Sequence, residues 1–314
     1  GAAAAGAVLL GLDKETTLNA LAIAGSHSAG LIEYTKTGGS VKRIHSAIPT
    51  AAGVRAAMFA AAGITGPHSI LEGEKGFCKV FAVDYDLNRL TEGLGTLYHT
   101  LDNALKPYSC CHLIHAAFDT LDALRDREPI DPEQVDSILV YTNSEQILSH
   151  IGSIIEPEDI LGAQFSLPFS LAMRLHHGGR GVNGGNGFWD YQKVDVKNPV
   201  LVNTARKVKC LVPTNAEWKA VDKGAGIEVI MKDGRRLKEI VAFSKGLPEN
   251  PMSAAEVEEK FHSLVDPILP KGRPQQIIDI VRRIETVKNI NELIELLIVP
   301  ADKRFAPIEG WKQR

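Results

Sequence analysis

The chain has 314 residues, a formal net charge of −3 and an apolar content of 44%. This length suffices for a real hydrophobic core and predicts one large domain or two smaller ones. The near-neutral charge does not indicate a nucleic-acid-binding or membrane-binding surface, and no apolar run approaches the roughly 20 residues of a membrane span.

Residues 1–104 are predicted to be mainly helical. Asp13 is the expected N-cap of a first amphipathic helix. An alanine-rich run from Ala47 to Ala62 predicts a second helix that ends at Gly63. The run from Leu87 to Leu105 has helical periodicity and predicts a third. The many small residues in this part indicate helices that approach one another closely.

A basic cluster interrupts the alanine-rich segments. After a turn-rich break, Lys42, Arg43 and His45 bring two fixed cations and one titratable imidazole within four residues. Such a cluster could hold a carboxylate substrate and move a proton beside it. The alternative is a solvated basic turn.

Residues 105–250 have a mixed pattern that predicts an α+β domain. Strands are expected at Val135–Thr142, Val208–Val212, Gly226–Met231 and Arg236–Phe243. The Asp233-Gly234 pair between the last two predicts a β-hairpin.

Residues 251–314 return to a helical pattern. Ser253 and Glu256 form a capping box, an apolar stripe follows from Ile277 to Val287, and a last short helix is expected at Asn291–Leu297. These helices need a surface to cover, and residues 1–104 offer one. We therefore predict a mainly α protein with an α+β part: a discontinuous helical domain (1–104 and 251–314) with an inserted α+β lid domain (105–250).

The four cysteines argue against a disulfide scaffold and favour a reducing, cytoplasmic compartment. Cys110, Cys111, His112 and His115 are close in sequence, but adjacent cysteines rarely bind one ion together, so no metal is expected. Cys110 is expected to pack in the core, and His112 to point away from a site shared with His115.

The sequence Gly179–Gly184 matches G-x-G-x-x-G, the pattern of dinucleotide-binding loops. Its context is wrong, because it follows the helix-like run Ser170–Leu175 and no helix is expected after it. A flexible glycine loop is the preferred interpretation.

Five stretches, taken together and in order, resemble the MmgE/PrpD family. They are Lys42–His45, Leu71–Phe77, Lys106–His115, Ala163–Ser170, and Lys245-Gly246 with Asn250–Ser253 and Lys260-Phe261. The resemblance implies a helical domain built from both chain ends, an α+β lid, a site between them, no cofactor and a homodimer.

By the same resemblance, His45, Lys106 and His115 are candidate catalytic residues, and Lys42, Arg43 and Cys111 are candidate substrate-binding residues. Cys111 stands where some relatives carry histidine. The implied activity is a cofactor-independent lyase that dehydrates or decarboxylates a small di- or tricarboxylate by proton transfer beside a carboxylate. Two alternatives remain open: an isomerase or epimerase that uses the same proton step, and a non-catalytic or split-enzyme subunit.

The family has a helical segment ahead of the point that corresponds to Gly1, and that segment contributes to the same site. Gly1 to Ala5 resemble the interior of a helix and lack the basic start of a signal peptide. A separate chain that supplies the segment is therefore a possible partner, besides the carboxylate substrate and a second copy.

Overall fold

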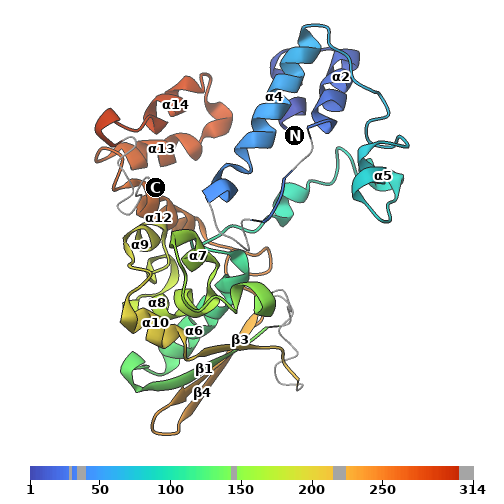
Figure 1. Ribbon diagram of the computed structural model, residues 1–314. Helices are drawn as coiled ribbons and strands as arrows, with labels where there is room; N and C mark the ends of the chain where they lie inside the picture. The colour runs from blue at the N-terminus through green and yellow to red at the C-terminus, as the bar shows by residue number, and fades with distance from the viewer. Residues whose placement is uncertain (28–29, 34–39, 143–146, 215–223, 304–314) are drawn as a thin grey trace. The chain divides into compact units, whose positions relative to one another are not determined.

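The protein is described here by a computed structural model that covers residues 1–27, 30–33, 40–142, 147–214 and 224–303. The chain divides into two compact units, Gly1–His99 and Thr100–Arg314, which are taken in turn (Figure 1). In the described part of the chain, no helix is both long and apolar enough to cross a membrane.

The first unit is built on three helices, α1 (Ala2–Leu9), α2 (Lys14–Gly25) and α4 (Ala47–Ala61). Asp13 caps α2 as predicted, because its carboxylate accepts a hydrogen bond from the Thr16 N–H at 2.8 Å. The core consists almost entirely of alanine: Ala3, Ala7, Ala20, Ala56, Ala57 and Ala60, with Ile23. Side chains this small allow the close helix packing that the composition predicted.

The predicted helix over Leu87–Leu105 is wrong. The structure has only two 3₁₀ turns there, Leu87–Leu90 and His99–Asp102. Between them Gly93 and Gly95 adopt positive φ values of 67° and 82°, which a continuous right-handed helix cannot contain. A short helix, α5 (Phe77–Phe81), precedes this region.

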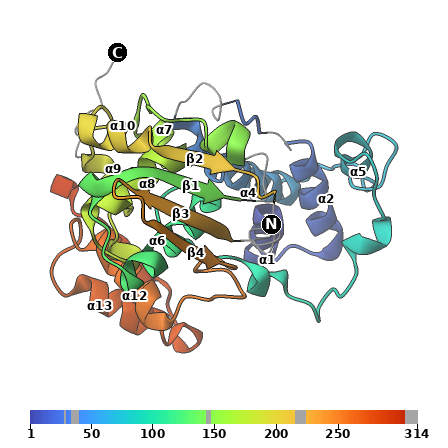
Figure 2. The same cartoon turned by 90° about the horizontal axis from the view of Figure 1, so that it is seen from below.

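The second unit contains a four-stranded sheet in the order β2-β1-β3-β4 (Figure 2). The strands are β1 (Val135–Tyr141), β2 (Val208–Leu211), β3 (Ala225–Met231) and β4 (Arg236–Val241). β1 pairs in parallel with β2 and antiparallel with β3, and β3 and β4 form the predicted hairpin.

Helices cover one face of this sheet, and the main hydrophobic core lies between the sheet and these helices. α6 (His115–Arg127) packs on β3 and β4, and the connection from β1 to β2 supplies α7 (Ile160–Phe165), α8 (Leu167–His177), α9 (Phe188–Lys193) and α10 (Pro199–Ala205). Phe118, Leu121, Ile138, Phe169 and Ile227 are all fully buried in this core.

Glu228 of β3 is only 2% exposed, and its carboxylate is held by side chains of both neighbouring strands, β1 and β4. Its carboxylate pairs with Arg236 at 2.7 Å and Lys238 at 3.7 Å, both on β4, and accepts from the Tyr141 hydroxyl at 3.4 Å. These contacts, led by the Arg236 hydrogen bond, lower the pKa of Glu228.

Three helices complete the second unit: α12 (Ala254–Val265), α13 (Arg273–Val281) and α14 (Asn291–Leu297). Both hydrogen bonds of the predicted capping box form, between Ser253 and Glu256. The mainly α class with an α+β part is thus confirmed. The domain boundaries at residues 104 and 250, and the packing of residues 251–314 on residues 1–104, stay predictions.

Candidate active site

The loop from Lys106 to His115, called the Lys106–His115 loop below, is held by backbone hydrogen bonds on several sides. Just before it, the Leu105 N–H donates to the Gly246 carbonyl at 2.8 Å. Within it, the Ser109 N–H donates to the Asn186 carbonyl at 3.0 Å, and the Cys111 N–H donates to the Gln164 carbonyl at 2.9 Å. The Gln164 side chain returns a hydrogen bond to the Ser109 carbonyl at 2.6 Å. Three segments far apart in sequence therefore fix this loop.

Gly246 must be glycine for this arrangement. Its φ is +91°, a conformation that L side chains rarely adopt, and a Cβ atom there would clash with the Leu105 carbonyl. Its own N–H donates to the Asn250 carbonyl at 2.8 Å. The Lys245-Gly246 motif is thus a backbone support for the segment that carries Lys106.

Asp119 of α6 holds the loop by hydrogen bonds. Its carboxylate accepts from the Tyr108 hydroxyl at 2.5 Å and from the Lys245 N–H at 2.7 Å. Burial raises the pKa of Asp119, and burial followed by the charge of Asp119 raises the pKa of Tyr108. This hydrogen bond ties the loop to the same segment that Gly246 supports.

A fully buried arginine, Arg174 of α8, lies under the Tyr108 ring, with its guanidinium 4.6 Å from the ring centroid. It makes a two-point ion pair with Asp122, at 2.9 and 2.5 Å, and donates to the Gly181 carbonyl at 3.0 Å. A Cβ atom on Gly184 would collide with the guanidinium.

The G-x-G-x-x-G sequence therefore forms a loop that packs against the buried Arg174 guanidinium, and it is not a dinucleotide-binding loop. The expectation that no helix follows it is wrong, because α9 begins at Phe188. The Gly187 N–H at the start of α9 donates to the Asp190 carboxylate at 2.9 Å.

Two ammonium groups meet at the Lys106–His115 loop. The Lys106 Nζ donates to the Cys110 carbonyl at 3.0 Å, and the Lys260 Nζ, from α12, donates to the Lys106 carbonyl. Neither lysine forms an ion pair with a carboxylate among the described residues. Burial, followed by the charge of Lys106, lowers the pKa of Lys260.

Two histidines lie beside these lysines. The His112 and His115 rings meet edge to face with centroids 4.9 Å apart, and Tyr108 contacts His115 on another side at 5.0 Å. The two rings lie together because His112 is in a 3₁₀ turn, His112–Ile114, that leads directly into α6. The expectation that His112 points away from a site shared with His115 stays a prediction.

His115 is fully buried, and neither of its ring nitrogens has a hydrogen-bond partner of ordinary geometry among the described residues. Burial lowers the pKa of His115 to about 2, with smaller contributions from His112 and Lys106 that outweigh the nearby Cys110 carbonyl. The imidazole is therefore neutral, and neither of its two nitrogen atoms is satisfied by a described residue. We call Lys106, His112, His115 and Lys260 the cationic cluster.

The predicted site residues fall into two groups. Lys106, Cys111 and His115 come together in the second unit, with Cys111 half-buried and Cys110 in the core as expected. Burial raises the pKa of the Cys110 thiol to about 12. In the described part of the chain, no group of three or more histidine, cysteine, aspartate or glutamate side chains is placed to bind a metal ion.

Lys42, Arg43 and His45 lie in the first unit, on and just after the 3₁₀ turn Ser40–Ile44. Lys42 and Arg43 are exposed and His45 is half-buried. Of the turn-rich break before them, Thr37 to Gly39 lie outside the described residues. That this group meets the Lys106–His115 loop stays a prediction.

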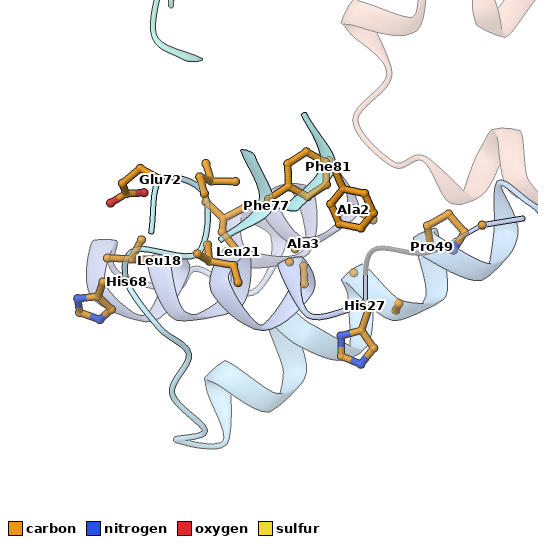
Figure 3. A pocket seen from close by; sticks show the side chains of 18 residues that line it. Ala2, Ala3, Leu18, Leu21, His27, Pro49, His68, Glu72, Phe77 and Phe81 are labelled. Atoms are coloured by element: carbon orange, nitrogen blue, oxygen red, sulfur yellow. The ribbon is translucent and has the colours of Figure 1, made fainter. Parts of the chain in front are cut away.

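The first unit also has an apolar pocket of about 810 Å³, lined by α2 residues such as Leu18 and Leu21 and by Phe77 and Phe81 of α5 (Figure 3). Among the residues that the structure describes, its lining contains no lysine or arginine and none of the predicted site residues. An apolar pocket without a cation does not suit a di- or tricarboxylate.

Sequence reasoning missed Lys260 and the supporting residues Gln164 and Asp119. Lys260 and Gln164 stand inside stretches that carried the resemblance, but nothing in a linear sequence shows that they reach the same loop. Asp119 lies outside those stretches, and its only signal is its position four residues after His115 on the predicted helix.

Comparison with known proteins identifies the family. The MmgE/PrpD N-terminal domain matches residues 1–90, and the MmgE/PrpD C-terminal domain matches residues 108–286. The second match alone covers more than half of the chain. The chain belongs to the MmgE/PrpD family, as the motifs predicted.

Several relatives are named as cis-aconitate decarboxylases. One from Aspergillus terreus (strain NIH 2624 / FGSC A1156) is 28% identical over 311 residues, which is 93% of this chain and 61% of the relative. The Homo sapiens relative is 24% identical over 98% of this chain and 62% of its own length. A cis-aconitate decarboxylase-like protein of Aspergillus oryzae is 25% identical. The chain spans about six tenths of the length of these curated relatives.

Proposed function

We propose that this protein is a lyase that works without a cofactor, by proton transfer beside a carboxylate, and that its substrate is a small tricarboxylate. Decarboxylation of cis-aconitate is the specific reaction to test first, because the relatives that cover most of this chain carry that name. The observation that carries the proposal is the cationic cluster, in which two ammonium groups share one loop without a carboxylate partner among the described residues.

The chemistry requires positive charge beside the reacting carbon. Loss of CO₂ breaks a carbon–carbon bond and leaves the electron pair on the substrate, where it spreads toward the remaining carboxylates. A proton then adds to carbon. Fixed cations stabilise the intermediate charge, and one preorganised donor of this kind is worth about 10²–10³ in rate. In the proposal Lys106 has this task.

The neutral state of His115 limits its role. With a pKa of about 2, His115 cannot donate a proton to substrate at neutral pH in the empty site. A bound polycarboxylate beside the ring would raise this pKa, because it adds negative charge where only cations now act. His115 is therefore proposed to accept a proton and return it only while substrate is bound.

The remaining candidate residues complete the proposal. From the first unit, Lys42 and Arg43 would bind a further substrate carboxylate, and His45 would serve as the second acid/base group. From the second unit, Cys111 would contact the substrate. We also propose the homodimer that the family resemblance implies, which light scattering of the purified protein would test.

The test is incubation of the full chain with cis-aconitate in deuterium oxide. Release of CO₂, with deuterium in the five-carbon product, supports the proposal, and loss of water from a hydroxy-tricarboxylate supports the dehydratase version. Exchange of substrate protons without loss of CO₂ or water identifies an isomerase instead. No reaction and no exchange with any di- or tricarboxylate would contradict a catalytic role.

A further inference from the structure

The helix α12 carries three glutamates close to Lys260, and each is engaged elsewhere. Glu256 pairs with the Lys245 ammonium at 3.0 Å and caps the helix. Glu258 pairs with Arg282 at 2.6 Å. Glu259 accepts a hydrogen bond from the Asn183 amide at 2.5 Å. A lysine on an acidic helix would normally take one of these carboxylates as its partner.

Lys260 instead reaches to the loop and donates to the Lys106 backbone carbonyl. There it stands half-buried beside a second ammonium group, and burial, followed by the repulsion between the two charges, lowers the pKa of Lys260. Each ammonium has three N–H donors, and the structure shows one of them in use on each lysine. The two groups together therefore keep up to four charged donors for a guest.

The polar atoms nearby also lack partners. The Nε2 atom of His112 and both ring nitrogens of His115 are buried without a hydrogen-bond partner among the residues that the structure describes. Buried polar atoms are normally satisfied by protein, water or a bound ligand. Within the described residues, these imidazole nitrogens and the two ammonium groups thus form a site without a paired carboxylate.

We propose that Lys260 and Lys106 together bind one carboxylate of the tricarboxylate substrate, so that Lys260 makes the protein select for a guest with that carboxylate. This inference rests on the proposed function but concerns a residue with no role assigned above. Lys245 is not the second lysine that binds this carboxylate, because its ammonium already pairs with Glu256.

The test measures binding separately from turnover. The probe is propane-1,2,3-tricarboxylate, which has three carboxylates but no double bond, and its affinity is measured by calorimetry. Lys260→Met should weaken binding roughly 10- to 100-fold, the usual range for loss of a charge-assisted hydrogen bond. Lys260→Arg should restore part of it. Lys271→Met, which removes an exposed lysine of the same unit, should leave binding unchanged.

Glutarate and methylsuccinate each lack one carboxylate of the probe, and they locate the interaction. In the wild-type protein the tricarboxylate should bind more tightly than both. In Lys260→Met, the tricarboxylate should bind hardly more tightly than one of the two dicarboxylates. That dicarboxylate lacks the carboxylate that Lys260 binds in the wild-type protein, and without Lys260 this carboxylate no longer adds affinity. An equal loss of affinity for all three ligands would overturn the inference, since it would show a general effect of charge.

The outcomes separate this inference from the proposed function. If the wild-type protein binds the probe and Lys106→Met abolishes binding while Lys260→Met does not, only the role of Lys260 is overturned. If the wild-type protein neither binds the probe nor reacts with cis-aconitate, both fall. Melting temperatures without ligand serve as the folding control, and Lys260→Met should not lower them because it relieves a repulsion between like charges.

Discussion

Single residues of the Lys106–His115 loop combine charge with burial in a way that favours an anionic guest. Lys106 and Lys260 repel one another, and His115 is held neutral by burial and by the same cations. In the described part of the chain, no carboxylate pairs with Lys106 or Lys260 to offset this repulsion. Such an arrangement lowers the stability of the empty protein and is explained most simply by a ligand that removes the strain.

Lys106→Met should lower kcat/KM for the tricarboxylate by about 10²–10³, because it removes the cation beside the developing charge. The measurement is the initial rate over a range of substrate concentrations. Lys271→Met is the matched control and should react at the wild-type rate. Wild-type turnover in Lys106→Met would remove this residue from the site.

The buried His115 makes stability depend on pH. Its pKa is about 2 in the folded protein and about 6.5 when unfolded, so between these values the unfolded chain binds more protons. Stability should therefore fall as pH drops below about 6.5, and the contribution of His115 amounts to about 2 kcal/mol at pH 5. Urea unfolding measures the loss of unfolding free energy between pH 7 and pH 5, and in His115→Met this loss should be smaller by about that amount. An unchanged difference in His115→Met would show that this imidazole does not cause the pH dependence.

Elements far apart in sequence support the site as a frame. Gly246 supports the start of the Lys106–His115 loop, Gln164 of α7 holds its middle, and α6 anchors it through Asp119. Beneath them, Arg174 of α8 and Asp122 of α6 form the buried ion pair around which the glycine-rich loop closes. The chemistry depends on side chains, but their positions depend on these backbone contacts.

Gly246→Ala should destabilise the protein by about 3 kcal/mol or more, because it combines a left-handed backbone with a clash against the Leu105 carbonyl. Gly234→Ala is the matched comparison. Gly234 has nearly the same φ, +90°, but open space around it, so its alanine variant should lose only about 1 kcal/mol. Chemical denaturation measures both, and equal losses would show that the clash is relieved by movement.

Arg174→Met should cost about 3–5 kcal/mol, since it leaves the Asp122 carboxylate near the core with only the longer ion pair to Arg125, at 3.9 Å. The double variant Arg174→Met with Asp122→Leu should recover part of this loss, because the carboxylate that lost its main partner is removed as well. The free energy of unfolding of the two single variants and the double variant completes the cycle. Additive losses would mean that the pair does not act as a unit.

The sequence predicted most elements of the second unit because their signals are local. The Asp-Gly turn set the β3–β4 hairpin, and the Ser253 capping box set the start of α12. The predicted helix over Leu87–Leu105 failed because periodicity alone did not weigh Gly93 and Gly95. In the site, Lys106 and His115 came from the resemblance, whereas Lys260 could be found only once α12 was seen to reach the loop.

At the scale of the whole molecule, the predicted site residues are divided between two units. Lys42, Arg43 and His45 belong to Gly1–His99, while Lys106 and His115 belong to Thr100–Arg314. The proposed reaction uses both sets on one substrate.

Lys42→Met should weaken binding of propane-1,2,3-tricarboxylate about 10-fold or more if Lys42 binds the same ligand as Lys106. The double variant with Lys106→Met should then lose a different amount from the sum of the single losses. Lys14→Met, an exposed lysine at the start of α2, is the control. Wild-type affinity in Lys42→Met would confine the ligand to the second unit.

The ladder of charges around Glu228 has a consequence for association. β4 is one of the two outer strands of the sheet, and Arg236 and Lys238 on it both pair with that one carboxylate. A strand from another molecule that extended the sheet at this border would have to strip water from these two cations. This cost of desolvation disfavours the addition of a strand from another copy along β4.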